Sequence, residues 1–207
     1  MLKSLKQLKF KDQNNGQLLS DRMEAFSDAV MAIIITITIV EFRIPSGSSF
    51  SSLKPLIPVL ITYLVSFQTI GTYWNNHHHL LHTTKRISAS SMWLNLNLLF
   101  WISLIPFATN WLGQNNGSTA PTVIYAAILL MCALSYTALQ YDIVSHSDKK
   151  EELFKELIKS KKSLVSLTSY ALAVIVAFIN PFLSYILIIF VSLIWFIPDK
   201  RVEKFIS

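Results

Sequence analysis

The 207-residue chain is rich in apolar residues and poor in charge: 52% of its residues are hydrophobic and 14% are charged, against about 25% charged in soluble domains. This composition excludes intrinsic disorder, and the single cysteine, Cys132, excludes a disulfide scaffold and a cysteine zinc site. The net charge of +6 comes from basic residues that lie between long apolar runs, which disfavours nucleic acid as a partner and favours the lipid bilayer.

Nothing in the sequence points to catalysis. The five glycines are too far apart for a phosphate-binding loop, and no serine lies in a nucleophile elbow with a histidine and an aspartate as partners. We therefore expect neither an enzyme nor a cofactor.

Six apolar segments predict an all-α, polytopic membrane protein, because a helix needs about 20 largely apolar residues to cross roughly 30 Å of hydrocarbon. Asn180-Pro181 interrupts the last long stretch and predicts a hairpin of two short helices. The chain, residues 1–207, is interpreted as one transmembrane domain with spans at about residues 23–42, 56–76, 92–112, 122–141, 163–179 and 182–197.

The basic residues predict the orientation of these spans. Sixteen of the 18 lysines and arginines fall in segments on one side, and only Arg43 and Lys54 fall on the other. Because lysine and arginine prefer the cytoplasmic side, we expect a multi-pass protein of the cell membrane with both termini in the cytoplasm.

Two cytoplasmic segments have amphipathic patterns. Leu2, Leu5 and Leu8 alternate with lysines before the first span, which predicts either a short helix at the headgroup level or disorder. The polar stretch 11–16 precedes any apolar run, so the N-terminus does not resemble a cleavable signal. The linker 147–162 carries apolar residues at helical spacing among lysines and glutamates, which predicts an interfacial helix.

The first span carries the most specific pattern. At about 100° per residue, one helical stripe contains Ala29, Ile33, Thr36, Ile37 and Val40. Arg22 and Phe26 lie near the same line at the start of the helix, whereas Ser27 and Asp28 point away from it. A stripe of small and β-branched residues is most often a helix-packing surface.

Asp28 needs a partner from another helix, because an unpaired carboxylate in hydrocarbon costs several kcal/mol. Polar residues at the same depth end the second span and open the third: His77, Trp93, Asn95 and Asn97. They predict a buried polar network that joins the first three spans.

The string Arg22-x-x-x-Phe26-Ser27-Asp28 resembles the signature of the transmembrane protein 175 family, the endosomal and lysosomal potassium channels and their bacterial homologues. Trp74-x-x-His77-His78 and Trp93-Leu94-Asn95, followed by Asn97, are similar to further features of that family. The resemblance covers the first three spans. It implies a potassium channel in which the first helix of each subunit lines the pore, and a chain with one such repeat forms a homotetramer.

The resemblance also implies roles for single residues. Ile33, with Ile37 and Val40 on the same stripe, matches the hydrophobic constriction, and Thr36 matches the threonine that selects ions. The residues that match the motif and its interhelical partners are Arg22, Phe26, Ser27, Asp28, His77, Trp93 and Asn97. Since the chain lacks the Thr-Val-Gly-Tyr-Gly filter, we expect potassium to permeate with modest selectivity.

Other functions remain possible from the sequence. A secondary transporter of a small cation or solute is the main alternative. Such proteins usually contain paired broken helices, whereas this sequence shows one hairpin at Asn180-Pro181 and one mid-span proline, Pro106, with no matching pair. A structural or receptor-like membrane protein is the third. His78 and His82 share a helix face, but zinc needs a third ligand that the local sequence does not supply, so we expect no metal site.

Overall fold

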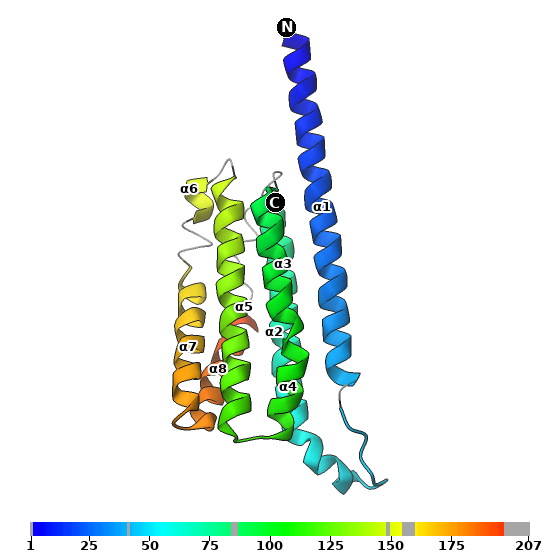
Figure 1. The fold of residues 1–207 in the computed structure, drawn as a ribbon, viewed down its shortest axis with the longest axis vertical. Helices are drawn as coiled ribbons and strands as arrows, with labels where there is room; N and C mark the ends of the chain where they lie inside the picture. Colours follow the sequence, from blue (N-terminus) through cyan, green and yellow to red (C-terminus); the bar gives the residue numbers. More distant parts are fainter. Residues whose placement is uncertain (1, 41, 84–86, 148–149, 155–159, 197–207) are drawn as a thin grey trace.

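The protein is a helical bundle, and none of its described residues lies in a strand. The computed structural model describes residues 2–40, 42–83, 87–147, 150–154 and 160–196, with side chains from Leu19 onward. The all-α class predicted from the sequence is confirmed. The elements in chain order (Figure 1) are α1 (Leu2–Val40), η1 (Phe50–Leu56), α2 (Ile57–Leu81), α3 (Ala89–Ser103), α4 (Ile105–Gln114), α5 (Thr119–Ser145), α6 (Lys150–Leu153), α7 (Lys161–Ala177) and α8 (Pro181–Phe196).

Four helical segments in the described part of the chain are long and apolar enough to cross a membrane. They overlap the first four predicted spans and comprise Leu19–Val40, Phe50–His82, Ala89–Gln114 and Thr119–Ser145. The helix break predicted at Asn180-Pro181 separates α7 from α8, which have 17 and 16 residues. Because α7 and α8 are shorter than a usual span, the count of six remains a prediction.

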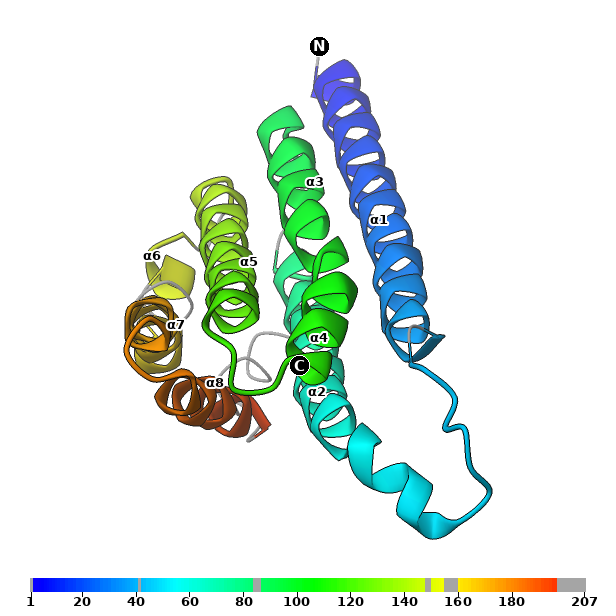
Figure 2. The same cartoon turned by 60° about the horizontal axis from the view of Figure 1, so that its bottom comes forward.

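The helices are arranged with α5 in the interior and α1 at the edge. α5 packs against α3, α4, α7 and α8, whereas α1 packs against α2, α3 and α4. Figure 2 shows α1 on the outer side of the bundle, across from the α7–α8 hairpin, and Figure 1 shows its first half extending beyond the other helices. One side of α1 therefore faces away from its own subunit.

The third predicted span is two helices rather than one. α3 ends at Ser103 and α4 begins at Ile105, with Leu104 between them. Pro106 explains the break, because it has no N–H to donate to Ile102 and its ring crowds the preceding turn. Pro106 is tolerated in the first turn of α4, where a backbone N–H has no partner within the helix.

The start of α3 is held by polar contacts to α5. The Ser91 backbone N–H donates to Ser88 Oγ over 3.0 Å, which caps the helix. Asp142 of α5 accepts hydrogen bonds from Ser91 Oγ at 2.5 Å and from Ser90 Oγ at 2.7 Å. A carboxylate is favourable there because the helix N-terminus carries partial positive charge.

A glycine allows α4 to approach α2 closely. A Cβ built on Gly113 would lie 2.6 Å from the Val59 Cα, which is closer than real Cβ atoms come to backbone. A methyl group at Gly113 would therefore push α2 and α4 apart.

The two predicted amphipathic segments are described only in part. The backbone of α1 is helical from Leu2, so the first span continues a longer helix, but the side chains of residues 2–18 lie outside the described set. In the linker 147–162, α6 is the described helix, and residues 148–149 and 155–159 lie outside. Leu153 of α6 is buried in the protein.

Candidate functional site at the two faces of α1

The helix α1 presents two different faces. Met31 is 1% exposed, and the buried face also contains Ser27, Ile34 and Thr38. Ile33 is 56% exposed, and the predicted stripe lies on this outward face. Its other exposed members are Phe26, Ala29, Thr36, Ile37 and Val40, and Arg22 is also exposed. The structure thus places the whole stripe where another chain, lipid or water can reach it.

Thr36 is the hydroxyl on this stripe. Its Oγ1 donates to the Ile33 carbonyl oxygen over 2.9 Å and lies 3.2 Å from the Ala32 carbonyl oxygen. Because the helix backbone accepts the single hydroxyl proton, the lone pairs of Oγ1 are free to point outward. An outward-facing neutral oxygen of this kind can replace part of the hydration shell of a cation.

A directed chain of hydrogen bonds fixes the opposite face of α1 to α2 and α3. Ser27 Oγ donates to the Met23 carbonyl oxygen over 2.8 Å and accepts from Asn95 Nδ2 over 2.9 Å. Asn95 Oδ1 lies 2.8 Å from His77 Nε2, so the imidazole donates through Nε2. All three side chains are buried, which makes the chain a polar lock between three helices.

The structure brings together only part of the predicted polar network. His77 and Ser27 are joined, but through Asn95 rather than through Asn97 or Trp93. Asn97 Nδ2 donates to Ser135 Oγ of α5 over 2.7 Å. Trp93 is 73% exposed. Asn95 and Asn97 lie at the same depth but about 200° apart around α3, so they face different neighbours.

One carboxylate oxygen of Asp28 has no hydrogen-bonding partner among the described residues. Its Oδ1 is buried and accepts no hydrogen bond from any described residue. The side chain as a whole is half-buried, because its position lies between the buried and the exposed faces of α1. The expectation that Asp28 joins the network of Ser27 stays a prediction.

Residue Glu24, which no sequence pattern singles out, lies beside the two histidines considered for a metal. Glu24 Oε1 is 2.5 Å from His78 Nδ1 and 3.9 Å from His82 Nε2. The sequence contains all three residues, but 54 residues separate Glu24 from His78, so the contact depends on how α1 packs on α2.

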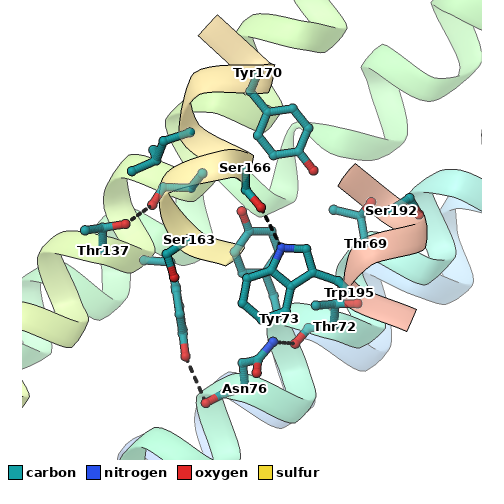
Figure 3. Close-up of a pocket in the computed structure, with 13 residues that line it drawn as sticks. Thr69, Thr72, Tyr73, Asn76, Thr137, Ser163, Ser166, Tyr170, Ser192 and Trp195 are labelled. Carbon is teal, nitrogen blue, oxygen red and sulfur yellow. Dashed lines mark hydrogen bonds between the residues drawn. The ribbon is translucent and has the colours of Figure 1, made fainter. Parts of the chain in front are cut away.

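A small cavity lined largely by hydroxyl-bearing side chains lies on the other side of the bundle, among α2, α5, α7 and α8 (Figure 3). Trp195 Nε1 donates to Ser166 Oγ over 2.8 Å at its wall. The cavity has a volume of about 40 Å³, and none of its described lining residues is charged. Solute pockets measure about 300–1,000 Å³, whereas a water molecule needs roughly 10–15 Å³. This cavity fits a few water molecules and does not favour the transporter alternative.

Comparison with known proteins places this geometry in a family. The sequence profile described as "Endosomal/lysosomal potassium channel TMEM175" matches residues 22–106, which include the lock and the stripe. A potassium channel of Chryseobacterium sp. strain P1-3 is 45% identical over 184 residues, or 88% of this chain and 95% of that protein. A potassium channel of Streptomyces collinus is 32% identical over 132 residues, or 60% of this chain and 64% of that protein.

A solved structure has the same fold. It is the crystal structure of a lysosomal potassium-selective channel TMEM175 homolog from Chamaesiphon minutus. It matches this structure with a TM-score of 0.77 and 26% sequence identity, over 86% of this chain and 97% of that chain. Together with the 45% identity over nearly the whole length of the Chryseobacterium protein, this match shows that the chain belongs to the TMEM175 family of ion channels.

Proposed function

We propose that four copies of the chain form a potassium-permeable, modestly potassium-selective channel in the cell membrane, with α1 of each copy lining the pore. The observation that carries this proposal is the exposed stripe of α1. One helix cannot enclose a pore, and α1 lies at the edge of its subunit with the stripe facing outward. A closed ring of four subunits buries such a face around a central axis.

The apolar members of the stripe form the gate. Ile33, Ile37 and Val40 are exposed in the single chain and would meet their counterparts at the axis. Stripping a cation of its water inside an apolar ring costs up to tens of kcal/mol by Born arguments. A ring of isoleucine side chains therefore stops ions by dewetting until it widens.

Selectivity comes from Thr36. Four Oγ1 atoms at one level offer neutral oxygens to a dehydrating cation, and potassium gives up its water at a lower cost than sodium. A single layer of hydroxyls is a weaker filter than stacked rings of carbonyls, so the preference for potassium is modest.

The membrane arrangement completes the proposal. α7 and α8 cross the bilayer as a short hairpin, which raises the four long spans to six and leaves both termini on the same side. The excess of lysine and arginine in the segments on that side supports a cytoplasmic location of both termini.

The decisive experiment measures potassium-driven flux into liposomes that contain the purified protein, with sodium in place of potassium as the second condition. The test variant is Ile33→Asn, and the matched control is Ile39→Asn. Ile39 is also an isoleucine of α1 and is 49% exposed, but it lies about 120° around the helix from Ile33.

We expect Ile33→Asn to raise potassium flux by about tenfold or more, because an amide wets the constriction, and Ile39→Asn to conduct like the wild type. Equal fluxes in Ile33→Asn and the wild type would contradict the assignment of the gate. Slow, saturable flux that is the same in the wild type and in Ile33→Asn would support a transporter. No flux in any variant would support a structural protein.

A further inference from the structure

Glu24, His78 and His82 form a cluster of metal-ligand types that bridges two helices. Glu24 lies on α1, while His78 and His82 lie one turn apart at the C-terminal end of α2. One ligand atom from each residue lies within 4.8 Å of the other two. Three atoms so close share a centre about 2.8 Å or less from each of them, against about 2.0–2.1 Å for a zinc–nitrogen bond. A shift below 1 Å per side chain would complete the coordination.

We propose that Glu24, His78 and His82 bind a divalent transition-metal ion, Zn²⁺, and that the ion links α1 to α2. Two imidazoles and one carboxylate are the donors that zinc takes in three-ligand sites, with water in the fourth position. Magnesium and calcium prefer sites built from oxygen, so a site with two imidazole ligands discriminates against them.

The local electrostatics favour a cation. The ion pairs of Glu24 among the described residues are with His78 and His82, so no described lysine or arginine neutralises its carboxylate. The 2.5 Å contact between Glu24 Oε1 and His78 Nδ1 is a hydrogen bond whose proton lies where the two atoms would share a metal ion. Zinc takes the place of that proton on Nδ1, and a neutral imidazole keeps the proton by shifting it to Nε2.

The site is open on one side. Glu24 is largely buried, whereas the side chains of His78 and His82 are nearly half-exposed. The two imidazole rings meet edge-on with centroids 4.4 Å apart, so both can turn toward a common ion. An ion can enter from this exposed side and keep a water ligand there.

A histidine–aspartate pair elsewhere in the chain provides the control. His146 and Asp142 also lie at i, i+4, with His146 Nδ1 4.0 Å from Asp142 Oδ2. No other described histidine, cysteine, aspartate or glutamate completes a cluster of three with them. Two ligands without a third hold zinc weakly, so this pair should not bind it at low micromolar concentration.

The test titrates Zn²⁺ into the full-length protein in detergent after removal of metals, with heat and metal content as the readouts, and repeats the titration with Co²⁺, whose tetrahedral complexes absorb visible light. We expect one ion per chain and intense Co²⁺ bands. His82→Gln should lower the Zn²⁺ affinity by about tenfold or more and remove the bands. His146→Gln should leave both unchanged.

His82→Gln is preferred to Glu24→Gln because Glu24 takes part in both contacts, at 2.5 Å and 3.9 Å, whereas His82 takes part in the longer one. Loss of the His82 imidazole therefore disturbs the packing of the metal-free protein least. Gel filtration of each variant checks its assembly. Equal Zn²⁺ affinity in His82→Gln and His146→Gln, or equal binding of Mg²⁺ and Zn²⁺ by the wild type, would overturn the proposal. These readouts measure binding alone and do not depend on ion conduction.

Discussion

The two faces of α1 differ in the kind of contact that holds them. The inner face combines close apolar packing at Met31 with the hydrogen-bonded chain from Ser27 through Asn95 to His77. The outer face, centred on Ile33 and Thr36, stays exposed in the part of the chain that the structure describes.

Hydrophobicity alone does not explain why the helix has this orientation. Both faces are mainly apolar, and lipid tails are as apolar as isoleucine, so no hydrophobic force distinguishes them in a membrane. The hydrogen-bonded chain does distinguish them, because turning α1 by one residue would separate Ser27 from Asn95. The polar lock on the inner face therefore determines which residues of α1 lie on the outer face.

The largest expected difference between the faces is in stability. Met31→Ala removes a buried side chain and should lower the free energy of unfolding by about 2–4 kcal/mol. Ile33→Ala, on the exposed stripe, should cost about 1 kcal/mol or less in a single subunit. Denaturant unfolding in detergent measures both, and equal losses would show that the two faces are packed alike.

The next effect separates the two asparagines of α3. Asn95→Leu leaves His77 Nε2 without its acceptor and Ser27 Oγ without its donor, and should cost about 1–2 kcal/mol. Asn97→Leu removes one hydrogen bond to Ser135 at an exposed position and should cost about half as much or less. Thermal unfolding of the two variants gives the comparison. A larger loss in Asn97→Leu would contradict the assignment of the lock to Asn95.

The smallest effect concerns two threonines that both donate to the α1 backbone. Thr36→Ala should lower the potassium-to-sodium permeability ratio by about two- to fivefold, because the proposed function assigns ion coordination to its Oγ1. Thr38 is buried and donates to the Ile34 carbonyl oxygen over 2.7 Å, so Thr38→Ala should leave the ratio unchanged. Reversal potentials in bilayers measure it, and an unaltered ratio in Thr36→Ala would remove this residue from the selectivity mechanism.

The sequence predicted most of the helices because their signals are local. Runs of apolar residues marked the four long segments, and Asn180-Pro181 marked the break before α8. The sequence does not predict the break at Leu104, although it contains Pro106, because a proline in a span can bend a helix or end it. The order of burial around α1 also followed from helical geometry, which separates Ile33 from Ser27.

The residues that meet across helices could not be predicted in the same way. Asn95 and Asn97 have the same chemistry and nearly the same depth, and only the rotation of α3 decides which of them reaches Ser27. The sequence lacked a third ligand for His78 and His82 because Glu24 comes from a different helix. Asp142 likewise contacts Ser90 and Ser91 from a distant part of the chain.

The unequal lengths of the helices have a consequence for the surrounding lipid. α2, with 25 residues, is about 37 Å long, whereas α7 and α8, with 17 and 16, reach about 25 Å, and hydrocarbon is roughly 30 Å thick. In the six-span arrangement, the bilayer beside the α7–α8 hairpin must become thinner to match the shorter helices. The outer rim of each subunit would then gather lipids with short acyl chains, and the assembly would respond to the thickness of its membrane.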